Sequence, residues 1–247
     1  MGIYENGVRT AWTGLMKHVE RNVAKVDALG TPLAKPAVDA PPVLLVHGYG
    51  NTSTAMGAIE RSLTRDGFRA FHVDLPNRGF DDAVADAAFV NAEVNRIRLV
   101  TGSRTVDAVG HSRGGLVART WQQKFQAPGS NGRVVTVSSA NTGLHLGPMD
   151  RVVGGALPEG MQQIRRGTEL IDDLARTRRG SDQVAVGTNG VDGILLPANS
   201  AKIEGAPFIA VDEGRTIGPM SRVTHYGILT DDAAYEAIRG ALLRPRS

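Results

Sequence analysis

The sequence predicts an α/β fold, a mostly parallel, doubly wound sheet with helices on both faces. Short apolar runs alternate with segments of helical spacing along most of the 247 residues. Strands that alternate with helices form a mainly parallel sheet. The run VLLVHG at 43–48 is apolar almost throughout, as expected of a strand buried on both faces. We therefore expect one α/β domain with a sizeable core at 41–247.

Residues 1–40 are expected to form an amphipathic helix and a proline-rich linker. The helix is expected over 5–29, where apolar side chains recur at helical spacing: Val8, Trp12, Leu15, Met16, Val19, Val23 and Val26. The segment LGTPLAKPAVDAPP that follows holds four prolines and a glycine, which favour an extended linker. The apolar stripe of the helix is expected to pack on the domain or on a second subunit, because an exposed stripe would be adhesive. Membrane attachment is the alternative, which the polar face disfavours because it has no strong basic bias.

The first half of the domain alternates regularly. After the strand at 43–48 we expect a helix over 54–66, and then a strand over 68–76 (FRAFHVDLP) that ends in a turn at 77–79. A helix over 82–100 and a strand over 105–112 (TVDAVGHS) come next. The strands are rich in apolar and β-branched residues and are bounded by turn-forming residues, whereas the helices repeat apolar residues every three or four positions.

The second half continues the same pattern. We expect strands over 133–141 (RVVTVSSAN), 183–190 (QVAVGTNG) and 207–214 (PFIAVDEG), by the same criteria. The helices of this half are expected over 114–126, 159–178 and 231–243.

The stretch VGHSRGGLVAR (109–119) predicts a nucleophile. A serine between two glycines joins a strand to a helix, the pattern G-x-S-x-G. In so tight a turn, side chains at Gly110 and Gly114 would collide with the neighbouring backbone. Ser112 would then stand clear of the carboxyl edge of the sheet, above a helix N-terminus that favours developing negative charge. The alternative is a Gly-Ser surface turn.

His225 is the expected general base, because a serine hydroxyl is a weak nucleophile without one. It lies in RVTHYGILTDD, after the last expected strand and before the final helix. This position fits the chain order serine, acid, histidine. His47 is expected to order the backbone rather than to act in catalysis, and His111 is expected to point away from the reaction. The other histidines are His18, His72 and His145.

Asp192 is the expected acid, because it comes a few residues after the penultimate strand. Asp212 is the rival, but it follows the last strand, where the histidine loop is expected. Three other candidates are expected to be solvated charges: Asp150, Asp172 and Asp173.

Two backbone N–H groups are expected to form an oxyanion hole. One belongs to Arg113, the residue after the nucleophile. The other belongs to Tyr49 in HGYGN (47–51), where glycines at 48 and 50 let the backbone approach a substrate. The alternative for this loop is an ordinary glycine turn.

These motifs together resemble the small bacterial α/β-hydrolase lipases, the class 2 triacylglycerol lipases of the Bacillus lipase A type and their actinobacterial relatives. The resemblance covers roughly residues 41–245 and is carried, in order, by PPVLLVHGYGNTS, HVDLPNRG, RTVDAVGHSRGGLVAR, QQIRRGTELIDDL, GVDGILLPANSAKIEGAP and THYGILTDD. It implies an α/β-hydrolase fold and cofactor-free cleavage of carboxylic esters, with Ser112, Asp192 and His225 as triad and Tyr49 and Arg113 as oxyanion donors.

Other activities of the same triad stay open: acyl transfer to an alcohol or amine, and the opening of a lactone or an amide. A non-catalytic binding protein is a further alternative, since a fold does not dictate a function. Acyl length, stereoselectivity and natural substrate do not follow from the sequence.

Composition narrows the possible partners. Lys and Arg number 28 against 25 Asp and Glu, and no aromatic residues interleave the arginines at 165, 166, 176, 178 and 179, so no nucleic-acid site is expected. Without cysteine, the chain forms no disulfide and no cysteine-based metal site; we expect neither metal nor cofactor. No apolar run approaches about 18 residues. The expected partner is a small-molecule or lipid ester; oligomeric state stays open.

The N-terminus MGIYENGVRTAWTG has no basic region followed by an apolar one. No signal peptide is therefore visible. As written, the chain is expected to be cytoplasmic, and secreted if a leader was removed.

Overall fold

The computed structural model describes residues 38–145, 157–176, 182–190, 192–195, 197–212 and 224–246. The expected helix at 5–29 and nearly all of its linker lie outside these residues, as do His18 and Asp150.

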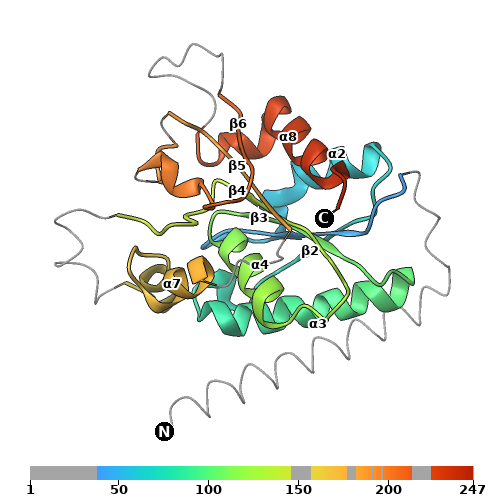
Figure 1. The fold of residues 1–247 in the computed structure, drawn as a ribbon, viewed down its shortest axis with the longest axis horizontal. Helices are drawn as coiled ribbons and strands as arrows, with labels where there is room; N and C mark the ends of the chain where they lie inside the picture. The colour runs from blue at the N-terminus through green and yellow to red at the C-terminus, as the bar shows by residue number, and fades with distance from the viewer. Residues whose placement is uncertain are drawn as a thin grey trace, which may run out of the picture.

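Within the described residues, six strands form one parallel sheet in the order β2-β1-β3-β4-β5-β6 (Figure 1). The strands are β1 (Val43–Val46), β2 (Ala70–Val73), β3 (Asp107–His111), β4 (Val134–Val137), β5 (Gln183–Gly187) and β6 (Phe208–Ala210). The central strands β1, β3, β4 and β5 are buried along their whole length, which explains their continuous apolar runs. The expected parallel sheet is confirmed.

Helices cover both faces of the sheet (Figure 1). One face packs against α3 (Ala83–Thr101), α4 (Arg113–Lys124) and α7 (Glu169–Arg176). The other packs against α2 (Gly57–Arg65) and α8 (Asp232–Leu243). The doubly wound arrangement that alternating strands and helices predict is therefore confirmed.

Local sequence signals set the ends of the longest described helix, α3. The Asp82 side chain precedes it and accepts hydrogen bonds from the backbone N–H groups of Val84 and Ala85, at 2.9 and 2.8 Å. The helix ends at Gly102, whose φ of 68° is left-handed, a conformation that glycine adopts readily. The capped α3 packs against α4 and β2.

The expected single helix over 159–178 is wrong. The structure has a short helix, α6 (Glu159–Gln163), then an irregular stretch, and then α7. In that stretch Arg165 forms an isolated parallel bridge with Leu144, which lies after β4, and Gly167 has a φ of 78°. A tertiary contact with the segment after β4 therefore interrupts a stretch whose local spacing is helical.

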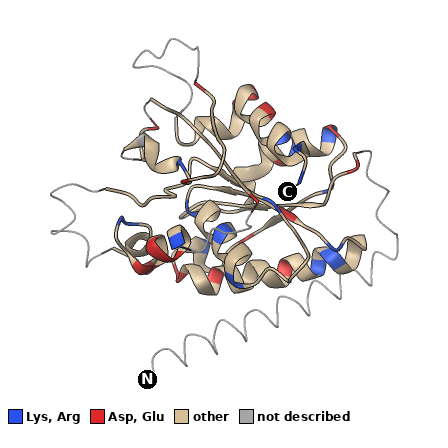
Figure 2. Cartoon of the chain, in the orientation of Figure 1, with Lys and Arg blue, Asp and Glu red and all other residues tan. Residues whose placement is uncertain are grey.

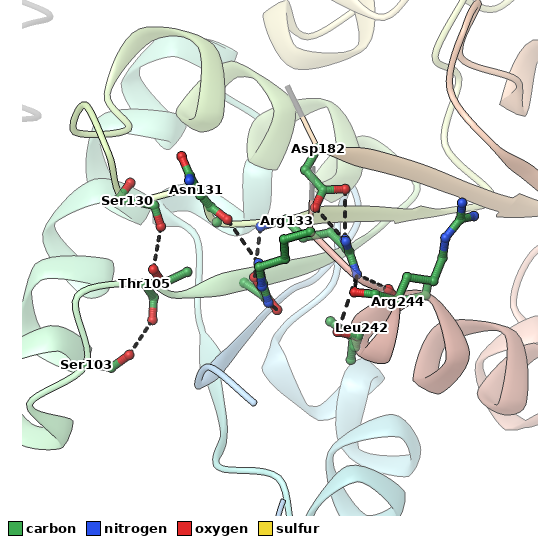
Figure 3. A network of polar contacts seen from close by, with 12 residues as sticks. Ser103, Thr105, Ser130, Asn131, Arg133, Asp182, Leu242 and Arg244 are labelled. Carbon is green, nitrogen blue, oxygen red and sulfur yellow. Dashed lines mark hydrogen bonds and ion pairs between the residues drawn. The ribbon is translucent and has the colours of Figure 1, made fainter. Parts of the chain in front are cut away.

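At the amino end of the sheet, Arg133 ties the C-terminal turn of α8 to the strands (Figure 3). Its Nε and Nη2 donate to the carboxylate of Asp182, at 2.8 and 2.6 Å. The same guanidinium donates to four backbone carbonyls, those of Ala241, Leu242, Arg244 and Pro245. The last carbonyls of a helix have no intrahelical donors. Here the buried guanidinium of Arg133 donates hydrogen bonds to them.

The order of the strands also decides where a site can form. The chain passes from β1 to β2 on one side and then returns to β3 on the other side of β1. In doubly wound sheets, ligands bind at the carboxyl ends of the strands where this reversal occurs. The loops after β1 and β3, which carry Tyr49 and Ser112, meet at that place.

Basic and acidic residues are interspersed over the described helices (Figure 2). No described helix is long and apolar enough to cross a membrane. Among the same residues, no group of three or more His, Asp or Glu side chains is arranged to hold a metal ion.

Candidate active site

Ser112 occupies a sharp turn between β3 and α4, with φ 54° and ψ −127°. A Cβ at Gly110 would lie 2.4 Å from the carbonyl oxygen of Gly114, and a Cβ at Gly114 would lie 2.4 Å from that of His47. Real Cβ atoms do not approach other atoms so closely, so both positions require glycine. The physical reason given for the G-x-S-x-G pattern is confirmed.

His225 lies between Ser112 and Asp192. Its Nε2 is 2.9 Å from Ser112 Oγ, and its Nδ1 is 2.8 Å from Asp192 Oδ1. The backbone N–H of His225 also donates to the carbonyl of Asp192 at 2.7 Å. The three side chains predicted from the sequence are thus brought together, from loops after β3, after β5 and before α8.

The environment of Asp192 keeps its carboxylate ionised. Oδ1 also accepts the backbone N–H groups of Ile194 and Leu195, at 3.1 and 2.8 Å. Burial raises the pKa of Asp192, but hydrogen bonds from His225 and Leu195, together with the nearby Ser138 hydroxyl, outweigh it and hold that pKa below its usual value. Ser138 Oγ and Asp192 Oδ2 are both buried, and by distance and angle neither forms a hydrogen bond within the described residues.

An ionised Asp192 fixes the tautomer of His225. The carboxylate accepts, so Nδ1 carries the proton and donates it. Nε2 is then left with its lone pair facing the Ser112 hydroxyl. An imidazole oriented in this way can take a proton from the serine while the carboxylate stabilises the resulting positive charge.

His111 supports His225 from behind. Its Nε2–H donates to the His225 backbone carbonyl at 2.8 Å, and the two rings have centroids 4.8 Å apart. Burial, with a smaller contribution from the neighbouring His225, lowers the pKa of His111 to about 3. His111 is therefore neutral under ordinary conditions and does not bond to Ser112, as expected from the turn.

The loop after β1 lies directly against the nucleophile. A Cβ at Gly48 would lie 2.9 Å from Ser112 Cβ, so only glycine allows this approach. His47 holds the loop: Nδ1–H donates to the Gly48 carbonyl at 2.8 Å, and Nε2 accepts the backbone N–H of Leu75 at 3.0 Å. Burial lowers the pKa of His47, in keeping with a neutral ring that donates and accepts. The expected backbone-ordering role of His47 is confirmed.

The backbone N–H groups of Tyr49 and Arg113 are the two donors expected to form an oxyanion hole. Within the described residues, neither donates to a protein acceptor. Arg113 N–H belongs to the first turn of α4, where backbone donors have no intrahelical partner. The Arg113 side chain is fully buried and pairs with Asp86 at 2.5 Å. Burial raises the pKa of Asp86 to about 6, and the arginine opposes that rise.

The structure gives Asp212, the rival candidate for the acid, other partners than His225. Asp212 is buried and accepts backbone N–H groups of Asn189 and Gly190 instead of contacting His225. Other side chains are at least partly exposed: His72, which pairs with Glu60; His145, in the loop after β4; Asp172, on α7; and Asp173, which pairs with Lys124 and Arg176.

Sequence reasoning missed three contributions to the site: the Ser138 hydroxyl, the Arg113 guanidinium and the Asp212 carboxylate. Ser138 has a φ of 44°, rare for a residue other than glycine, but nothing in the sequence marks it. The other two act through partners remote in sequence, and only the fold reveals them.

Comparison with known proteins identifies the family. A family model described as alpha/beta hydrolase fold matches residues 41–175, more than half of the chain. The chain belongs to the α/β-hydrolase family. A triacylglycerol lipase of Vibrio cholerae is 30% identical to this α/β-hydrolase over 125 residues, which are 48% of this chain and 38% of that lipase. The α/β-hydrolase therefore spans well under two thirds of that relative.

Solved structures share the fold of this α/β-hydrolase. A mature Bacillus licheniformis lipase superposes with a TM-score of 0.65 at 17% identity, over 86% of this chain and 96% of that one. An Aspergillus fumigatus lipase B superposes with a TM-score of 0.64 at 17% identity, over 84% of this chain and 53% of that one. At such identities the likeness establishes the fold alone.

Proposed function

We propose that this α/β-hydrolase is a serine carboxylic-ester hydrolase, a lipase or esterase that forms an acyl-enzyme on Ser112. The observation that carries the proposal is the position of the His225 ring, with one nitrogen 2.9 Å from Ser112 Oγ and the other 2.8 Å from Asp192 Oδ1. A nucleophile, its base and the group that orients the base lie in hydrogen-bond sequence, which is the geometric signature of nucleophilic catalysis.

Acylation begins with attack of Ser112 Oγ on the ester carbonyl. His225 Nε2 takes the serine proton as the new C–O bond forms, and Asp192 stabilises the imidazolium. The negative charge that develops on the carbonyl oxygen is accepted by the backbone N–H groups of Tyr49 and Arg113. The C–O bond to the alcohol then breaks, and the alcohol leaves with the proton from His225.

Deacylation repeats these steps with water. His225 Nε2 takes a proton from the water that attacks the acyl-enzyme, and returns it to Ser112 Oγ as the carboxylic acid leaves. The sequence of bonds balances with ester and water alone, so the proposed reaction requires no metal and no cofactor.

The surroundings favour an ester with an apolar part. Ile194, two residues after the acid, and Tyr226, directly after the base, are large apolar or aromatic side chains exposed to 45% and 51%. Tyr49 packs its ring against Phe80, with centroids 4.6 Å apart. Exposed apolar side chains that neighbour the acid and the base in the sequence suit an acyl chain or a lipid, and the Vibrio cholerae relative is a triacylglycerol lipase.

Substitution of the serine tests the proposal. Ser112→Ala, in folded protein, should lose on the order of a million-fold in the turnover of a soluble p-nitrophenyl ester. The same variant should no longer react with a fluorophosphonate probe. Ser130→Ala is the matched control, because Ser130 is a buried serine at the opposite edge of the sheet, near the start of β4. Folded Ser112→Ala that keeps parental turnover would refute the proposal.

Product analysis separates hydrolysis from acyl transfer. With methanol or a primary amine added, a hydrolase should still release mainly the carboxylic acid, whereas a transferase should release mainly the new ester or amide. A series of esters of increasing chain length should then separate a lipase from an esterase for short acyl chains.

A further inference from the structure

The guanidinium of Arg113 is buried although its residue directly follows the nucleophile. Its exposed fraction is 0%, and that of its partner Asp86 is 1%. Nη1 donates to Asp86 Oδ2 at 2.5 Å, and Nη2 donates to the backbone carbonyl of Asp81. A buried ion pair is a poor means of gaining stability, since apolar side chains of the same volume often do as well or better. Because the Arg113–Asp86 pair lies beside the nucleophile, a role in the site explains it better than stability does.

Two glycines make room for this guanidinium. A Cβ at Gly79 would lie 3.1 Å from Arg113 Nη1, and a Cβ at Gly160 would lie 2.8 Å from Arg113 Nε. Gly79 belongs to the short 3-10 helix η2 (Pro76–Gly79), and Gly160 belongs to α6. Segments far apart in the sequence thus close around one side chain.

The segment that Arg113 holds also contacts the loop of the other oxyanion donor. The backbone N–H of Gly50 donates to the carbonyl of Arg78 at 2.9 Å. Both Asn77 and Arg78 are left-handed, with φ of 43° and 53°. Residues other than glycine keep such conformations only where their surroundings hold them, and they gather at functional sites. The Tyr49–Phe80 ring contact joins the same two segments.

These contacts form a continuous path from one N–H donor to the other. It runs from Tyr49 through Gly50 to Arg78, along the chain to Asp81, and from the Asp81 carbonyl to Arg113. We propose that the guanidinium of Arg113, anchored by Asp86, is a positioning group that sets the distance between the Tyr49 and Arg113 N–H groups. The inference rests on the proposed function, because it concerns the donors proposed there.

A group that positions the two N–H donors should stabilise the transition state rather than the bound substrate. The oxyanion forms only when the carbonyl becomes tetrahedral, so donors that shift apart weaken binding of that state more than binding of the substrate. A misplacement of about 1 Å can cost about a hundredfold in rate. Loss of the guanidinium should therefore lower kcat and leave KM nearly unchanged.

Arg113→Met and Asp86→Asn test this in the full-length protein. Each should lower kcat by roughly 10- to 100-fold while KM changes by no more than about threefold. The affinity for an alkyl boronic acid, which forms a tetrahedral adduct on the serine, should fall by the same factor as kcat/KM. Affinity for the carboxylic acid product should not change. The double variant should be no worse than Arg113→Met alone, because the two side chains act as one unit.

Two further variants complete the experiment. Arg113→Lys keeps a cation beside Asp86 but loses the fork that also reaches Asp81, so it should fold and lose about tenfold in kcat. Arg133→Met is the matched control, because it removes a buried, paired arginine at the opposite edge of the sheet. It should lower stability and leave the kcat of the folded protein unchanged.

Folded Arg113→Met, Arg113→Lys and Asp86→Asn that all keep kcat within twofold of wild type would overturn the inference. Equal kcat losses in Arg133→Met would do the same. Failure of the proposed function is distinct from both results, because the wild-type protein would then neither hydrolyse esters nor react with a fluorophosphonate at Ser112.

Discussion

Both carboxylate oxygens of Asp212 lie within hydrogen-bond distance of the backbone N–H of Asn189, at 2.9 and 3.0 Å. The N–H of Gly190 adds a third contact at 2.9 Å. Asp212 is buried and follows β6, while Asn189 and Gly190 begin the loop that leads to Asp192. Sequence spacing alone does not distinguish the two aspartates, but their contacts do. Asp212 binds the backbone of the loop, and Asp192 binds the histidine.

The two aspartates should respond differently to asparagine. Asp192→Asn should lose about 10⁴ in kcat, because its amide favours the wrong His225 tautomer. Asp212→Asn should lose less than about tenfold but unfold a few degrees earlier, since one or two bonds to a buried carboxylate are lost. Parallel ester assays and melting curves check both. A dead Asp212→Asn beside a near-parental Asp192→Asn would reverse the assignment.

Ser138→Ala should lower kcat by roughly tenfold without unfolding the protein. The hydroxyl lies near the Asp192 carboxylate and lowers its pKa, so its loss leaves this buried charge less stabilised. Ser139→Ala is the control, because the hydrogen bonds of Ser139 Oγ within the described residues go to the carbonyls of Gly110 and Val137, at 3.5 and 3.4 Å, and not to Asp192. Equal activity of the two variants would remove Ser138 from the site.

The contribution of His111 to the free energy of unfolding should fall as the pH is lowered from about 6.5 towards 3, whereas Asp86, whose pKa is raised to about 6, contributes in the opposite direction. Burial holds the pKa of His111 at about 3, whereas the unfolded value is 6.5. Between these values the unfolded chain binds the extra proton, so acid favours unfolding, by at most about 1.4 kcal/mol per pH unit for each such group. His47, whose pKa is also lowered by burial, acts in the same direction.

Denaturation by urea at a series of pH values measures this dependence. His111→Asn, which cannot take up the proton, should show a shallower slope over the same pH window than the wild type, whatever its absolute stability. An identical slope in the two proteins would mean that His111 is not neutral in the folded state.

Arg133→Met should lower the free energy of unfolding by about 3–5 kcal/mol, because it leaves Asp182 and the last carbonyls of α8 without their partner. For a chain of this size, that corresponds to a fall in Tm of roughly 10 °C. Calorimetry measures it. An unchanged Tm would show that water replaces the arginine at those carbonyls.

The sequence predicts the local parts of the site well. The elbow at Ser112 depends on glycines two residues away on either side, and the β1 loop depends on Gly48, so short-range sterics suffice. Asp192 and His225 are found from the order of strands, because each follows the end of a predicted element. The sheet is predicted from short, continuous apolar runs, which are typical of strands buried on both faces of a parallel sheet.

Contacts between distant segments are not predictable in this way. The interruption before α7 depends on Leu144 pairing with Arg165 across the fold, whereas the local spacing is helical. The Arg113–Asp86 pair joins residues 27 apart, and nothing in GHSRGG indicates whether that arginine is solvated or buried. Such contacts are set by how helices pack on the sheet, which hydrophobic periodicity does not specify.

The backbone conformation of Ser112 has a consequence for selection. A serine with φ 54° and ψ −127° is strained where glycine is not, at a cost of about 1–3 kcal/mol. A library randomised at position 112 and screened for thermal stability alone should therefore enrich glycine, and every enriched clone should lack the hydroxyl. In a lineage without selection for activity, stability would favour the same replacement of Ser112 by glycine. A lineage that keeps the serine is therefore under continued selection for the chemistry of its hydroxyl.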